Sequence, residues 1–178
     1  MGVDRDTLAS WLADYDKDSL TIGVVASHSS LQILHGARKE GFRTLGIAVG
    51  ENRRKIYQAF PGADPDEWLI LEDYREMLDY AEWFRQRNVI IIPHGSLVEY
   101  LGSTNFKTLE VPTFGNRGIL HWESSRQRQR DWLEAGGCEM PKVLEDPHDI
   151  DGPVIVKYAG AKGGRGYSIA RDYRDFRR

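Results

Sequence analysis

Four short apolar runs, separated by segments of helical periodicity, constrain the fold of this chain more than any other feature. They occupy residues 20–26, 44–49, 68–71 and 89–92 and are rich in β-branched residues. Runs of this kind predict buried strands, because a strand covered on both faces by helices is apolar throughout. The segments between them are long enough for crossover connections, which join parallel strands of one sheet. The pattern therefore predicts an α/β fold with an open, mostly parallel sheet.

Helical periodicity is clear in three places. Apolar residues recur every three or four positions from residue 31 to about 40, and Gly41 ends that predicted helix. The same spacing predicts a helix over residues 73–87. A further helix, capped by Asp4 or Asp6, is predicted before the first strand.

The second half of the chain follows a looser pattern. Residues 102–116 are predicted to form turns and short extended pieces, and a polar helix follows over roughly 123–135. Two further strands are predicted at 154–157 and 167–170, with a glycine-rich loop between them. The last residues are typical of the first turn of a helix.

The composition excludes several classes of protein. Apolar residues make up 40% and charged residues 29%, which favours a packed core over disorder. A formal net charge of −3 argues against broad binding to nucleic acid. No apolar run reaches the ~20 residues that a membrane span needs, and a single cysteine, Cys138, cannot form an internal disulfide. These features predict a cytoplasmic protein.

Two polar turns, at residues 27–30 and 94–96, follow predicted strands and precede helices. In open parallel sheets, ligands bind beyond the carboxyl ends of the strands. Helix amino termini supply free N–H groups there, and histidine and serine add donors that suit a phosphate or a sugar hydroxyl. The competing interpretation is that the serines only cap helices and the histidines are satisfied turn residues. On the first interpretation, the substrate-binding residues are His28, Ser29, His94, Gly95 and Ser96.

The glycine-rich loop is the second candidate site, with four glycines between residues 160 and 166. It lacks both the G-x-x-x-x-G-K-[ST] pattern and the strand–helix setting of a Walker loop. Glycine backbone N–H groups together with basic side chains can still hold a nucleotide triphosphate. The competing interpretation is an ordinary hairpin turn with solvated basic side chains. On the first interpretation, the ATP-binding residues are Lys157, Lys162, Gly163, Gly164, Arg165 and Gly166.

The sequence predicts no metal site within this chain. Its five histidines show no metal-ligand spacing, and there is no pair of cysteines. Cys138 follows two glycines without an activating neighbour, so a structural role is favoured over a nucleophilic one. We assign no catalytic residue from these patterns.

Four segments resemble, in order and spacing, the archaeal 5-formaminoimidazole-4-carboxamide ribonucleotide (FAICAR) synthetase family of ATP-grasp enzymes. The resemblance covers the chain from about Leu20 to Ala170. It implies a Rossmann-like pre-ATP-grasp domain over residues 1–120, then a linker helix and the truncated start of an ATP-grasp domain over 121–178. The segments are ASHSSLQILHGARKEGF, IIPHGSLVEYLG, FGNRGILHWESSR and DIDGPVIVKYAGAKGGRGYSIA.

The resemblance implies a reaction in purine (IMP) biosynthesis. 5-Aminoimidazole-4-carboxamide ribonucleotide (AICAR), formate and ATP would give FAICAR, ADP and phosphate through a formyl phosphate intermediate, with Mg²⁺ or Mn²⁺ as the metal. Nucleotide-substrate contacts of the family fall on His28 and Ser96, and ATP contacts begin near Lys157. The family's metal-binding carboxylates lie in a second half that this chain lacks. Gly118 and His121 depart from the basic residues expected at those positions.

The resemblance therefore implies an amino-terminal fragment that is inactive alone. A homo-oligomer is compatible with it, as is a separate chain that carries the carboxyl-terminal half. Two other hypotheses stay open: a module that binds a purine precursor without catalysis, and a paralogous ATP-grasp ligase with another substrate.

Overall fold

The structure is a computed structural model that describes residues 3–157 and 167–178. It contains two compact units, Met1–Trp132 and Leu133–Arg178. The domain division expected at residue 120, with domains over 1–120 and 121–178, stays a prediction. Within the described part of the chain, every helix is too short or too polar to span a bilayer.

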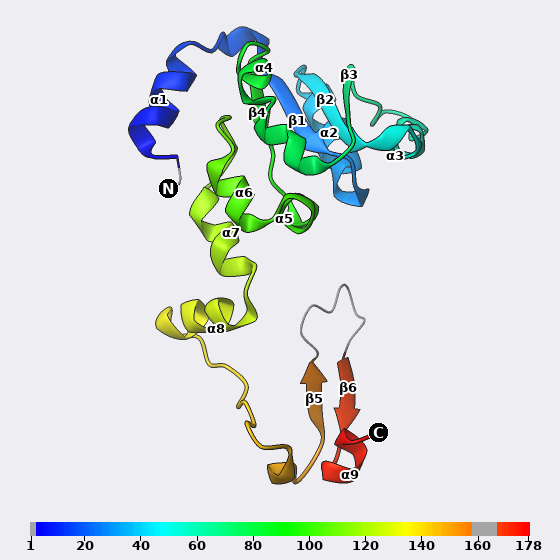
Figure 1. Ribbon diagram of the computed structural model, residues 1–178, viewed down its shortest axis with the longest axis vertical. Coiled ribbons are helices and arrows are strands. Elements are labelled where there is room, and N and C mark those ends of the chain that lie inside the picture. The colour runs from blue at the N-terminus through cyan, green and yellow to red at the C-terminus, as the bar shows by residue number, and fades with distance from the viewer. Residues whose placement is uncertain (1–2, 158–166) are drawn as a thin grey trace. The chain divides into compact units, whose positions relative to one another are not determined.

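The first unit is built on a four-stranded sheet in which every neighbouring pair is parallel (Figure 1). The order is β3-β2-β1-β4, so the predicted α/β fold with a parallel sheet is confirmed. A parallel bridge between Ile91 and Thr113 extends the sheet beyond its fourth strand. The strands are β1 (Thr21–Val25), β2 (Arg43–Val49), β3 (Glu67–Leu71) and β4 (Val89–Ile91).

The register of the strands explains how the core is divided. Val25 is paired with Ile47, and both belong to the larger apolar cluster together with Ile91 and Val111, all with no exposed surface. The next residue back, Val24, points to the other face and packs with Leu34. Both faces of the sheet are therefore covered, which is why its strands are apolar without alternation.

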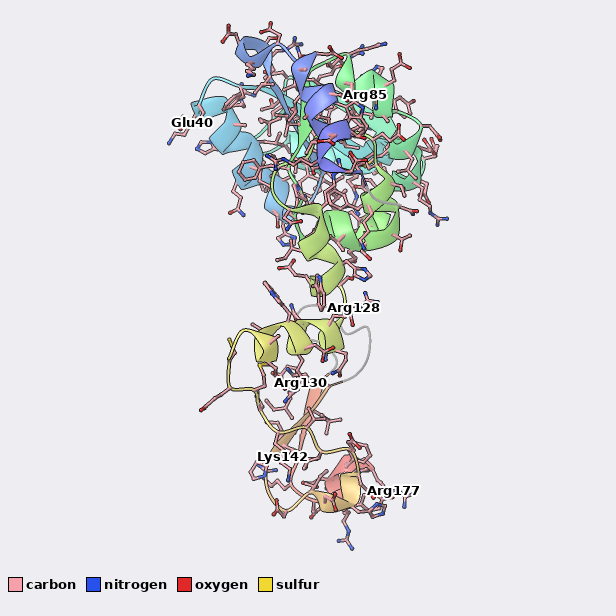
Figure 2. All side chains as sticks on the ribbon, turned by 90° about the vertical axis from the view of Figure 1, so that its left-hand side faces the viewer. Glu40, Arg85, Arg128, Arg130, Lys142 and Arg177 are labelled. Atoms are coloured by element: carbon pink, nitrogen blue, oxygen red, sulfur yellow. The ribbon has the colours of Figure 1, made fainter. Side chains whose placement is uncertain are left out.

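Helix α2 (His28–Lys39) forms where its periodicity predicts. Leu34 and Ala37 are buried, whereas Glu40 just after the helix points away from the sheet (Figure 2). The next helix, α3 (Gly50–Gln58), was not predicted, because its residues are mostly polar and none of them is buried.

The continuous helix predicted over residues 73–87 is wrong. The chain forms a short 3₁₀ turn, η2 (Tyr74–Leu78), and then α4 (Ala81–Arg85). Tyr80 leaves helical geometry between them, with φ −89° and ψ 8°. Both pieces bury apolar residues against the same core, so the periodicity is real although the helix is broken.

The turns predicted over residues 102–116 are also partly wrong. Gly102, with φ 82°, separates α5 (Gly95–Leu101) from α6 (Ser103–Thr108). The buried side chain of Phe106 ties α6 to the core, although the helix is otherwise polar. The later helices are α7 (Arg117–Glu123) and α8 (Arg126–Ala135), the second lying within the predicted polar helix.

The amino-end rim of the sheet is closed by hydrogen bonds. The chain reaches it through α1 (Arg5–Ala13) and η1 (Lys17–Ser19). Asn88, in the left-handed region with φ 51°, accepts from the backbone N–H of Asp16 at 3.1 Å and donates to Ser19 Oγ at 3.0 Å. The buried Tyr15 hydroxyl donates to the carbonyl of Val89 at 2.9 Å, and burial raises the pKa of this tyrosine.

The second unit contains an antiparallel hairpin of β5 (Val154–Lys157) and β6 (Tyr167–Ala170), as predicted. It also contains η3 (Pro147–Asp149) and α9 (Tyr173–Phe176). The rings of His148 and Tyr173 stack at 3.8 Å and join η3 to α9. One face of the hairpin is apolar and exposed, because Ile155 and its partner Ile169 are 64% and 57% exposed.

Candidate functional site

The two polar turns singled out in the sequence lie at one rim of the sheet. They follow β1 and β4, which are neighbouring parallel strands, so both carboxyl ends point the same way. From β1 the chain turns to β2 and β3 on one side, whereas β4 lies on the other side. This reversal makes the junction of β1 and β4 the topological switch point, where open α/β sheets bind ligands. We call the space above it the rim crevice.

In the turn after β1, two serines are used to start α2. Ser27 Oγ accepts from the N–H of Ser29 at 3.2 Å, and Ser30 Oγ accepts from the N–H of Ser27 at 3.1 Å. The Ser30 hydroxyl also donates to the carbonyl of Ser27 at 2.6 Å. Ser27 and Ser30 are both buried, whereas His28 is exposed and Ser29 is half-buried. The capping interpretation therefore holds for Ser27 and Ser30.

In the turn after β4, His94 connects the two turns through hydrogen bonds of its imidazole ring. Its Nδ1 accepts from the N–H of Ser96 at 3.2 Å, and its Nε2 lies 3.2 Å from the carbonyl oxygen of Val25. A backbone N–H can only donate and a carbonyl can only accept, so these contacts require a neutral imidazole with its proton on Nε2. Burial lowers the pKa of His94, and the nearby His28 lowers it further.

Three polar side chains remain for a ligand at the rim crevice. Within residues 3–157 and 167–178, no hydrogen bond engages the imidazole of His28 or the hydroxyls of Ser29 and Ser96. Ser96 is 8% exposed and His28 is exposed, so one lies deep in the turn and the other at its surface. Gly95 is exposed, and a Cβ there would meet nothing within 4 Å. The structure thus brings together all five substrate-site residues predicted from the sequence, with His94 engaged internally.

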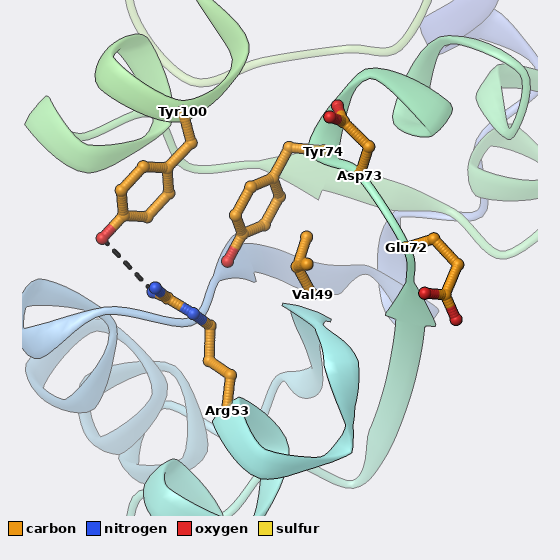
Figure 3. A pocket seen from close by; sticks show the side chains of 6 residues that line it. All are labelled: Val49, Arg53, Glu72, Asp73, Tyr74 and Tyr100. Atoms are coloured by element: carbon orange, nitrogen blue, oxygen red, sulfur yellow. Dashed lines mark hydrogen bonds between the residues drawn. The ribbon is translucent and has the colours of Figure 1, made fainter.

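A cavity of about 320 Å³ lies at the same rim, beyond the ends of β2 and β3 (Figure 3). Tyr74 and Tyr100 stack there with ring centroids 5.0 Å apart. Arg53 enters from α3 and donates a hydrogen bond to the Tyr100 hydroxyl at 3.2 Å. These residues could not be predicted from the sequence, because none belongs to a motif and the helix that carries Arg53 is mostly polar with no buried residue. The lining residues are Val49, Arg53, Glu72, Asp73, Tyr74 and Tyr100.

Arg117, in the segment that resembles the family around residues 114–126, has a structural role. It donates to Thr113 Oγ1 at 3.0 Å and to the backbone carbonyls of Leu109 and Val111. Its guanidinium also lies 5.5 Å from the ring of Phe106. Burial lowers the pKa of Arg117 to about 10. Arg117 therefore fastens the loop between α6 and α7.

The predicted ATP-binding residues belong to the second unit. Lys157 is exposed at the end of β5, paired with Tyr167 across the hairpin. The other five fall outside the described residues: Lys162, Gly163, Gly164, Arg165 and Gly166.

The part of the chain that the structure describes has no cluster of metal ligands. No group of three or more histidine, cysteine, aspartate or glutamate residues there could hold a metal ion. We therefore name no metal ligand.

Comparison with known proteins gives three consistent matches. A family model described as "Protein of unknown function (DUF1246)" matches residues 22–144. The 5-formaminoimidazole-4-carboxamide-1-(beta)-D-ribofuranosyl 5'-monophosphate synthetase of Methanosarcina barkeri is 53% identical over 174 residues, which cover 98% of this chain and 49% of that protein. The crystal structure of an IMP biosynthesis protein PurP from Thermococcus kodakaraensis is 33% identical with a TM-score of 0.55, and the match covers 80% of this chain and 41% of that one.

A more distant structure supports the fold alone. The ADP complex of purK, an N5-carboxyaminoimidazole ribonucleotide synthetase, has a TM-score of 0.67 at 13% identity, over 89% of this chain and 43% of that chain. The chain spans about half the length of the curated relatives it matches.

Proposed function

This chain belongs to the DUF1246 family and to the family of the FAICAR synthetases, and on that premise we propose that it is the ribonucleotide-holding part of such a ligase. The complete enzyme would formylate AICAR with formate and ATP. Its product would be FAICAR, a precursor of IMP, and its compartment the cytoplasm.

The observation that carries the proposal is the rim crevice. His28, Ser29 and Ser96 keep unused polar atoms at the switch point of the sheet, beside the amino terminus of the 12-residue helix α2. A helix amino terminus attracts a phosphate through its free N–H groups and its dipole. We propose that the phosphoribosyl group of AICAR occupies this crevice, with His28 and Ser96 as its side-chain contacts.

The proposed chemistry places different demands on the second unit. A formate oxygen attacks the γ-phosphorus of ATP and ADP leaves; the amine of AICAR then attacks the formyl carbon and phosphate leaves. Phosphoryl transfer depends on positioning and on positive charge around the transferred group. We propose that Lys157 and the residues from Lys162 to Gly166 contribute ATP contacts.

The proposed reaction also requires a divalent metal ion. An ATP-dependent ligase of this kind uses Mg²⁺ or Mn²⁺, but the described residues contain no acidic cluster suited to either. We propose that the metal ligands belong to the remaining half of the enzyme. We expect the chain alone to release no ADP, and formate- and AICAR-dependent ADP release from it would contradict this expectation. We propose that a second chain carrying the remaining half completes the enzyme, and a homo-oligomer is compatible with this arrangement.

The test is calorimetric titration of the 178-residue chain with AICAR. We expect measurable binding that His28→Ala and Ser96→Ala each weaken by about fivefold or more, the effect of losing a hydrogen bond to a charged group. His35→Ala is the matched control, because His35 is an exposed histidine of the same helix, seven residues further along. Unchanged affinity in both site variants would contradict the proposal.

A further inference from the structure

Arg53 joins the two turns of the rim crevice from a third element. It lies on α3 and donates from Nη1 to the backbone carbonyl of Ala26 at 3.0 Å. The same nitrogen donates to the hydroxyl of Tyr100 at 3.2 Å (Figure 3). The guanidinium carbon is 5.0 Å from the centroid of the Tyr100 ring.

Each of these two acceptors is close in sequence to one of the predicted ligand contacts. Ala26 precedes Ser27 and His28 in the turn after β1. Tyr100 belongs to α5, whose first turn holds Ser96. The two hydrogens of one planar guanidinium nitrogen therefore connect the turn after β1 to α5, the helix that begins at the turn after β4.

Tyr74 supports the arrangement from the core side. Its ring is 7% exposed and stacks on Tyr100 with an interplanar angle of 11°. Its hydroxyl is buried without a hydrogen-bond partner in the described part of the chain, and burial raises its pKa. Because the core holds Tyr74 in place, Tyr100 has little freedom to move away from Arg53.

The surroundings of Arg53 do not favour a direct contact with the ligand phosphate. Glu72 and Asp73 line the same cavity and are exposed, so they make its potential less positive. Nη1 already donates to two protein oxygens. A phosphate contact would have to use the other donors of Arg53, Nε and Nη2, beside these two carboxylates.

We infer that Arg53 is a positioning residue for ribonucleotide binding, setting the spacing of the His28 and Ser96 turns through Ala26 and Tyr100. This inference rests on the proposed function of the rim crevice. Its role is to fix the geometry of the unliganded crevice, so that less ordering is needed when the nucleotide binds.

The experiment measures AICAR affinity in the 178-residue chain for Arg53→Met, Arg53→Lys and Tyr100→Phe. We expect Arg53→Met to weaken binding by about tenfold and Tyr100→Phe by about threefold, with partial recovery in Arg53→Lys. The double variant should bind no worse than Arg53→Met alone, because both changes break one connection. Arg54→Met is the control, since Arg54 lies on the same helix and, among the described residues, hydrogen-bonds only to Glu51 and Gln58 of that helix.

A second measurement separates positioning from direct contact. NMR titration of the His94 imidazole, without ligand, reports on the turns themselves, because His94 bridges Val25 and Ser96. In Arg53→Met, a loosened turn admits water, so the pKa of His94 should rise toward its ordinary value. Weakened AICAR binding with an unchanged His94 titration would overturn the positioning role in favour of direct contact.

The remaining outcomes also decide the question. If His28→Ala and Ser96→Ala leave affinity intact, the proposed function fails. If those variants weaken binding but Arg53→Met and Tyr100→Phe do not, only the role of Arg53 is refuted. Should Arg53→Met not fold, Tyr100→Phe decides, because it removes a single hydroxyl and keeps the stacked ring.

Discussion

Replacing His94 tests whether this histidine holds the two turns together. His94→Ala removes the cap on the N–H of Ser96, worth about 1 kcal/mol, and the hydrogen bond to the carbonyl of Val25, worth about 1 kcal/mol or more when the carbonyl is buried. The expected loss of unfolding free energy is therefore about 2–3 kcal/mol. Asparagine is itself a good helix cap but is too short to reach Val25, so His94→Asn should lose about 1 kcal/mol.

Urea unfolding of the chain at pH 8 measures both losses, with the slope of free energy against urea checked for constancy. His35→Ala is the control, since this exposed histidine makes one hydrogen bond, with the carbonyl of Gly62, whose loss should cost about 1 kcal/mol or less. Equal stability of the alanine and asparagine variants would refute the cap, and wild-type stability of both would refute the connection between the two turns altogether.

Three further predictions concern Arg117, Gly46 and the pH dependence of stability. Arg117→Met should destabilise the chain by about 2–4 kcal/mol in urea unfolding, because several loop carbonyls lose their donor; a loss below about 1 kcal/mol would contradict the structural role. Gly46→Ala should lower the free energy of unfolding by about 1–3 kcal/mol, because the added Cβ would lie 2.6 Å from the ring of Trp68. Gly36→Ala, on α2 with nothing within 4 Å of the added Cβ, should raise it by up to about 1 kcal/mol. A higher melting temperature for Gly46→Ala than for Gly36→Ala would contradict the packing around Gly46. The pKa of His94 in the folded chain lies below the ordinary 6.5. The stabilisation that the neutral His94 gives to the folded state is therefore complete above pH 6.5 and is lost as the pH falls through the folded pKa. His94→Asn should flatten this part of the curve of unfolding free energy against pH.

The strands could be predicted because a strand buried on both faces consists almost entirely of apolar residues, which the sequence shows directly. Residues 20–26 and 89–92 are almost entirely apolar, and short runs of this kind rich in β-branched residues are typical of a sheet covered on both faces. The helix α3 (Gly50–Gln58) could not be predicted in the same way, since it buries none of its residues and so carries no periodic signal. The broken helix at residues 74–85 shows the opposite error: continuous periodicity concealed a change of backbone geometry at Tyr80.

The placement of the two polar turns at one rim was predictable, whereas the interactions of their residues were less so. Parallel topology places the ends of β1 and β4 at one rim, so His28 and Ser96 could be paired from the sequence. The engagement of His94 depends on its reach across to Val25, which is a tertiary contact. Arg53 is likewise recognisable only once its acceptor at Ala26 is known.

The closed rim at Asn88 determines where a probe can be attached without disturbing ligand binding. Lys17 is exposed beside that rim, at the end of the sheet away from His28 and Ser96. A Lys17→Cys chain in a Cys138→Ser background would carry its only thiol there and could be tethered to a sensor surface through it. Immobilised in this way, the domain would keep the rim that carries His28 and Ser96 toward the solution.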